Sequence, residues 1–186
     1  MKKKIIVLAL GICLSLGVTA CGSESAETGE GAVSSETATT EAKIPLQKEI
    51  LTFVGESLPS ISGDRDRAVQ LYNDYFNEGG EKDSDKWMTT LSQEALPKYE
   101  TYLSNLKGLK TSNDEVTTLK NLYLESAELQ RDAIQLVVDA IKNADSTILD
   151  KAQAKVEASR TKLQEYNDNL KTLCEQNSIT LEDAGK

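Results

Sequence analysis

The chain has 186 residues, of which 39% are hydrophobic, 27% are charged and 5% are aromatic. It contains no histidine, which excludes imidazole-dependent catalytic triads and histidine-ligated metal sites. Acidic residues number 30 against 21 lysines and arginines, giving a formal charge of −9. Because nucleic-acid binding needs clustered basic residues to neutralise phosphates, this charge argues against a nucleic-acid partner.

The first 20 residues are organised like a secretory signal. Three lysines, Lys2 to Lys4, are followed by an apolar run from Ile5 to Val18. That run is shorter than the roughly 20 residues that a helix needs to cross a bilayer. We therefore assign residues 1–20 to a signal peptide and leave them out of the fold.

The end of this signal is Val18-Thr19-Ala20-Cys21. A short aliphatic residue, two small residues and a cysteine resemble the lipobox of bacterial lipoproteins. The resemblance covers only about the first 22 residues. It implies cleavage after Ala20, a diacylglyceryl thioether on Cys21, and acylation of the new amino terminus by a fatty acid such as palmitate. Two or more acyl chains would hold the protein stably on the extracytoplasmic face of the cell membrane.

Two points about this segment stay open. The alternative is an ordinary cleaved signal in which Cys21 is a chance small residue. The membrane that holds the anchor is also undetermined, although Gly22 is not the aspartate that would suggest retention at an inner membrane. If Cys13 is removed with the signal and Cys21 is modified, Cys174 is left without a partner, which rules out a disulfide framework.

Residues 21–42 are rich in serine, threonine, glutamate, glycine and alanine. Such a segment cannot bury enough apolar surface to offset the entropy of ordering, so we expect a disordered tether that spans roughly 25 Å. Residues 43–186 then form one domain. Their apolar residues recur with a period of about 3.6, which predicts an all-α fold: an up-down antiparallel bundle of three to four main helices.

Two long helices are predicted at the end of the chain. The first begins at Ser112, where Glu115 completes a capping box, and extends to about Asn143 with two apolar stripes. After a short break it is followed by a second helix to about Gln176, which carries a heptad-like seam. Short connections between helices of equal length predict an antiparallel hairpin.

The earlier elements are less clearly marked. A helix capped near Asp83 contains Pro97, which either kinks one helix or separates two. A shorter helix is predicted from about Asp64 to Asn77, ended by Gly79-Gly80. Residues 43–57 suit either a helix or a strand, and we favour a helix. A final turn is expected from Ser178 to Asp183.

No reactive constellation stands out. Cys174 fits buried packing, and the acidic residues of segment 77–85 fit a solvated turn better than a calcium loop, which would need a different spacing. Gln130 and Arg131 interrupt the apolar pattern of their helix, and we expect a polar contact at the helix boundary there. We predict no cofactor, no metal and no enzymatic activity.

Aromatic residues are the best candidates for a binding surface, because tyrosine is favoured where its ring contacts apolar groups and its hydroxyl contacts water. The candidate residues for such a groove are Tyr72, Tyr75, Trp87, Tyr99 and Tyr102. The alternative is packing at the edge of the core. The sequence thus predicts a lipid-anchored helical module that binds an envelope protein, a peptide or a wall polymer, or has a structural role. Alternatives are a small-molecule carrier and an accessory component of an envelope enzyme.

Overall fold

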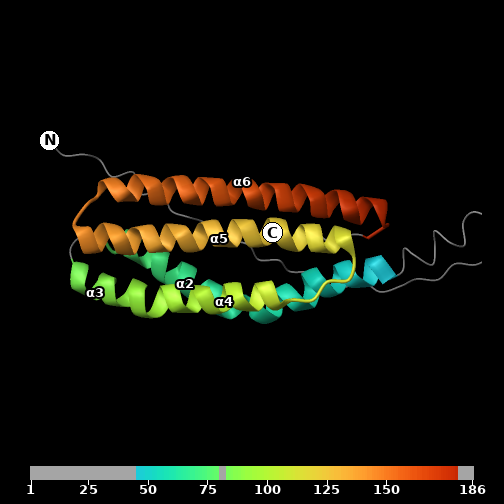
Figure 1. The fold of residues 1–186 in the computed structure, drawn as a ribbon, viewed down its shortest axis with the longest axis horizontal. Helices are drawn as coiled ribbons and strands as arrows, with labels where there is room; N and C mark the ends of the chain where they lie inside the picture. The colour runs from blue at the N-terminus through green and yellow to red at the C-terminus, as the bar shows by residue number, and fades with distance from the viewer. Residues whose placement is uncertain (1–44, 80–82, 180–186) are drawn as a thin grey trace, which may run out of the picture.

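The computed structural model describes residues 45–79 and 83–179, which form a bundle of four antiparallel helices (Figure 1). No strand occurs in this part of the chain. The predicted all-α, up-down bundle is therefore confirmed. The signal peptide, the tether and most of the turn predicted at Ser178 to Asp183 lie outside the described residues.

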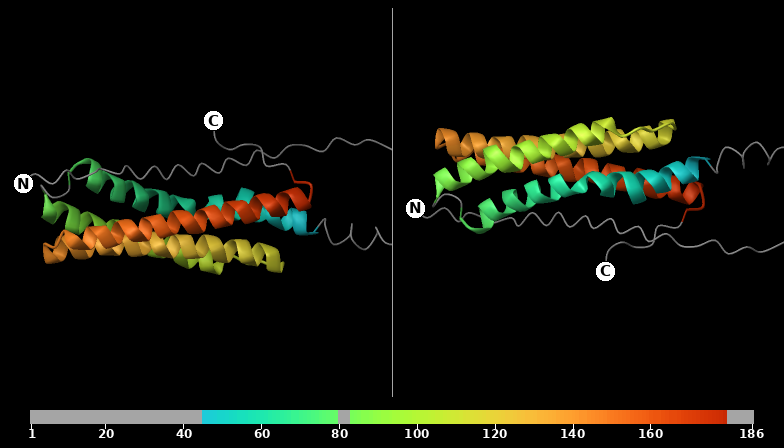
Figure 2. Two further views of the ribbon diagram at one scale, coloured as in Figure 1. Left: turned by 90° about the horizontal axis from the view of Figure 1, so that it is seen from above. Right: turned by 90° about the horizontal axis from the view of Figure 1, so that it is seen from below.

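The first helix consists of residues 45–52, the π-helical segment η1 (Phe53–Ser57) and α2 (Leu58–Asn77) without a break. The second joins α3 (Ser84–Thr90), η3 (Leu91–Ala95) and α4 (Leu96–Gly108). The third and fourth are α5 (Asp114–Asn143) and α6 (Thr147–Gln176). Neighbouring helices run in opposite directions, and the two hairpins lie against each other along their length (Figure 2).

Both π-helical segments immediately precede a Leu-Pro pair. The N–H of Leu58 bonds to the carbonyl of Phe53, and the N–H of Leu96 bonds to that of Leu91. A proline lacks an N–H and crowds the preceding turn, so a turn widened by one residue accommodates it without ending the helix. Pro97 therefore lies within one continuous helix, and the alternative in which it separates two helices is wrong.

The amino-terminal part of the domain differs most from its prediction. The helix favoured over a strand for residues 43–57 is confirmed for residues 45–57, but it continues directly into α2, which was not predicted. The helix predicted from Asp64 to Asn77 is therefore only the last part of a helix that begins at residue 45. Gly55, Pro59 and Gly63 lower helix propensity here, and burial of Ile50, Val54 and Leu58 against the bundle overrides it.

Side-chain caps fix the helix boundaries. Asn113 Oδ1 accepts from the N–H of Glu115 at 2.8 Å, so the cap of α5 lies one residue after the predicted Ser112. Asp83 Oδ1 accepts from the N–H of Lys86 at 3.1 Å, as expected for the start of α3. Between α5 and α6, Ala144 has a φ of 50°, which ends α5 and turns the chain back.

The first helix contributes a regular seam to the core. Its inward-facing positions follow steps of four and three residues, as in a coiled coil: Val54, Leu58, Ile61, Arg65, Ala68, Tyr72 and Tyr75. Six of these seven residues are apolar or aromatic. Arg65, near the middle, is the exception and brings a charge to the centre of the bundle.

Glu49 joins the first helix to the start of α5. Its Oε1 accepts from the backbone N–H groups of Ser112 at 2.5 Å and of Asn113 at 3.1 Å. We expect Glu49→Ala to lower the free energy of unfolding by about 1–2 kcal/mol, since both hydrogen bonds involve a carboxylate. Urea unfolding followed by circular dichroism measures this loss. Glu56→Ala, at an exposed position of the same helix, is the matched control and should change stability by less than about 0.5 kcal/mol.

Within the described residues, no helix combines the length and apolar character needed to cross a membrane.

Candidate functional site

The five aromatic residues considered for a binding surface lie in the core. Tyr72, Tyr75, Trp87, Tyr99 and Tyr102 are each at most 5% exposed. Four of the rings pack edge to face in two pairs, with centroids 5.9 Å apart for Tyr75 and Trp87 and 5.5 Å apart for Tyr99 and Tyr102. They fall on inward-facing positions of the helices, so the expected exposed groove is not formed by these side chains. Core packing describes them instead.

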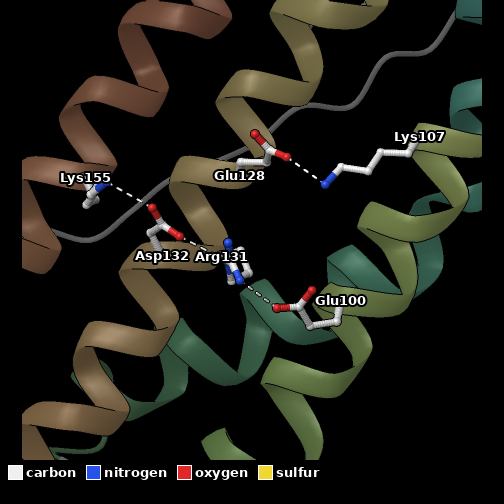
Figure 3. A network of polar contacts seen from close by, with 6 residues as sticks. All are labelled: Glu100, Lys107, Glu128, Arg131, Asp132 and Lys155. Carbon is white, nitrogen blue, oxygen red and sulfur yellow. Dashed lines mark hydrogen bonds and ion pairs between the residues drawn. The ribbon is translucent and has the colours of Figure 1, made fainter.

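The exterior of the described residues is polar, and Leu51 is their one exposed large hydrophobic side chain. Ion pairs connect neighbouring helices there, as Figure 3 shows for α4, α5 and α6. Asp132 pairs with Lys155 at 2.9 Å and with Arg131 at 3.0 Å, and Arg131 pairs with Glu100 at 2.9 Å. Exposed pairs contribute little stability individually. They leave a charged surface available to a partner.

Polar side chains from all four helices meet near the middle of the bundle, and we call this group the polar layer. It contains Arg65 from α2, Tyr99 and Tyr102 from α4, Tyr123, Ser126 and Gln130 from α5, and Ser159 and Tyr166 from α6. Apolar residues fill the core on both sides of it.

One half of the polar layer is internally paired. The Tyr99 hydroxyl donates to Gln130 Oε1 at 2.7 Å, and Gln130 Nε2 donates to Ser159 Oγ at 3.0 Å. Ser126 Oγ lies 2.9 Å from Ser159 Oγ and 3.0 Å from the Ser159 carbonyl. The expected polar contact of Gln130 thus joins α4 to α6 through α5. Each polar group in this half has a partner, as burial requires.

The other half surrounds Arg65. Its Nη1 donates to the Tyr123 hydroxyl at 2.5 Å, while Nε and Nη2 donate to Asp66 Oδ1 at 3.0 and 2.7 Å. The guanidinium carbon lies 5.9 Å from the centre of the Tyr102 ring, and the Tyr123 and Tyr166 rings are 5.0 Å apart. The Tyr166 hydroxyl is buried and has no hydrogen-bond partner among the described residues, whereas the buried Tyr102 hydroxyl lies beside that of Tyr123.

Protonation states in the layer follow from this environment. Burial raises the pKa of the Tyr99, Tyr102 and Tyr166 hydroxyls above their usual range, and nearby Tyr123 raises each further. Burial lowers the pKa of Arg65, but Tyr123 and Asp66 more than offset this effect. At neutral pH the layer therefore presents protonated hydroxyls and a positive charge. These hydroxyls are therefore poor general bases at that pH.

Cys174 is buried near the end of α6, and burial raises the pKa of its thiol to about 11. The thiol is therefore protonated at neutral pH, as expected for a packing residue. No group of three or more histidine, cysteine, aspartate or glutamate residues that could hold a metal is present among the described residues. The calcium loop considered for segment 77–85 lies partly outside them.

A shallow pocket of about 320 Å³ lies where the two hairpins turn, next to the end of α5 and the start of α6. Its polar wall includes Ser84, Asp145 and Ser146. The Asp145 carboxylate is already engaged by the N–H and hydroxyl of Thr147, at 3.0 and 2.7 Å. These contacts lie in the turn before α6 and occupy the carboxylate, so the pocket offers a ligand few free polar groups.

Sequence patterns indicated only part of the polar layer. Tyr99, Tyr102 and Gln130 are sequence candidates, whereas the pattern does not indicate a polar role for Arg65, Ser126 or Ser159. The signal for Arg65 was the spacing of Leu58, Ile61, Arg65 and Ala68, which places a charge in an apolar seam. It was missed because residues 58–63 were not expected to join the helix favoured for residues 43–57 to the helix predicted from Asp64.

Comparison with known proteins identifies no family. No protein-family model matches the chain, and neither the curated proteins nor the solved structures contain a significant match.

Proposed function

We propose that this protein is a bacterial lipoprotein whose helical bundle is a binding or structural module outside the cell membrane. The carrying observation is the Val18-Thr19-Ala20-Cys21 motif after a basic start and an apolar run. Lipid on Cys21 anchors the chain, and residues 21–42 act as its tether. The partner is an envelope protein, a peptide or a wall polymer.

The arrangement of the bundle supports this proposal. The Gln47 side chain donates to the Asn177 carbonyl, so the start of the first helix lies beside the end of α6. The tether therefore joins the domain at this end. Helices α5 and α6 have 30 residues each, about 45 Å at 1.5 Å per residue, and place the α5–α6 turn at the opposite end. A bundle with a charged exterior, tethered at one end, would bind a partner through its outer surface.

The anchor is tested by replacing the modified cysteine. We expect Cys21→Ser to abolish incorporation of an alkynyl fatty acid and to leave the protein unprocessed or released from the membrane. Labelling followed by fractionation of cells expressing the full chain measures both effects. Cys13→Ser, which removes a cysteine from the signal itself, should leave labelling and fractionation unchanged. Normal processing and membrane retention of Cys21→Ser would contradict the lipoprotein assignment.

Partner binding is tested separately in the intact envelope. A photoreactive residue is placed at exposed Lys151, near the membrane-distal turn, or at exposed Glu157 along α6. A discrete crosslinked species from one position supports a binding module. Its absence from both positions, with the anchor intact, favours a purely structural role.

A small-molecule carrier is the second candidate. The observation that favours it is the half of the polar layer around Arg65, where a largely buried guanidinium contacts the Tyr123 hydroxyl and lies over the Tyr102 ring.

A further inference from the structure

We draw no further inference here: the strongest candidate, the shallow pocket lined by Tyr75, Ile141 and Leu149 among others at the end of the bundle where the two hairpins turn, carries nothing because no feature of the described residues shows what would occupy it.

Discussion

Raising the pH from about 9 to about 11 is expected to remove most of the stability of this protein. Burial raises the pKa of four tyrosine hydroxyls, those of Tyr72, Tyr99, Tyr102 and Tyr166, above the value of an exposed tyrosine. Below pH 10 these hydroxyls are protonated in both the folded and the unfolded chain, so their contribution is fully present. Above pH 10 the unfolded chain ionises and the folded chain does not, so stability falls.

The expected size of this loss is large. Each tyrosine whose pKa is raised contributes a loss of about 1.4 kcal/mol per pH unit until its folded pKa is reached. Four such groups give roughly 5 kcal/mol per pH unit, which is comparable with the whole free energy of unfolding of a small domain. Burial raises the pKa of the Cys174 thiol to about 11. Its ionisation in the unfolded chain therefore adds to the loss of stability, beginning at a lower pH than that of the tyrosines.

Urea unfolding at several pH values, with tyrosinate absorbance recorded in parallel, measures this effect. Tyrosinate from the four buried residues should appear together with the loss of helical signal. Tyr166→Phe removes one of the four groups and should make the fall shallower by about 1.4 kcal/mol per pH unit. A free energy of unfolding that stays constant between pH 9 and pH 11 would show that the hydroxyls ionise as freely in the folded chain as in the unfolded one.

The fold could be predicted where helix periodicity and capping agree. The boundaries of α5 and α6 came within one or two residues, because both helices combine a regular seam with clear turn residues near Asn113 and Ala144. The heptad-like seam predicted for α6 is buried, at Val156, Ser159 and Tyr166 among others. These are features of local sequence, and they need no knowledge of the other helices.

The first helix could not be predicted in the same way. Gly55, Pro59 and Gly63 each disfavour a helix locally. What holds this segment helical is contact with residues distant in sequence, such as the bond from Glu49 to the start of α5. The π-helical turns before Pro59 and Pro97 are likewise outcomes of packing that a period of 3.6 does not encode.

The candidate site, too, could be predicted only in part. Tyrosine is amphipathic, but the spacing of the tyrosines in the sequence does not show whether each hydroxyl faces solvent or another buried polar group. In this bundle the Tyr99 hydroxyl meets Gln130 of a neighbouring helix, and the Tyr123 hydroxyl meets Arg65. Such pairings depend on the relative register of helices, so the polar layer emerges only once the four helices are assembled.

Substitutions at Tyr99 give the clearest test of whether the candidate aromatic residues belong to the core or to a binding surface. Its side chain is fully buried, and its hydroxyl donates to Gln130 at 2.7 Å. We expect Tyr99→Ala to lower the free energy of unfolding by about 3–5 kcal/mol, because it leaves a cavity and an unpaired amide oxygen. Tyr99→Phe keeps the ring and should lower it by only about 1–2 kcal/mol. Chemical denaturation of the two variants beside the wild type gives both values.

The difference between these variants isolates the packing of the ring from the hydrogen bond of the hydroxyl. Leu51→Ala, at the exposed hydrophobic position, controls for loss of apolar side chain without a cavity and should change stability by less than about 0.5 kcal/mol. If Tyr99→Ala were as stable as the wild type and instead lost a crosslinked partner, the ring would belong to a binding surface. Because Tyr99 is buried in the middle of the polar layer, its ring is inaccessible to a partner in the folded bundle. We therefore expect Tyr99→Ala to lose stability.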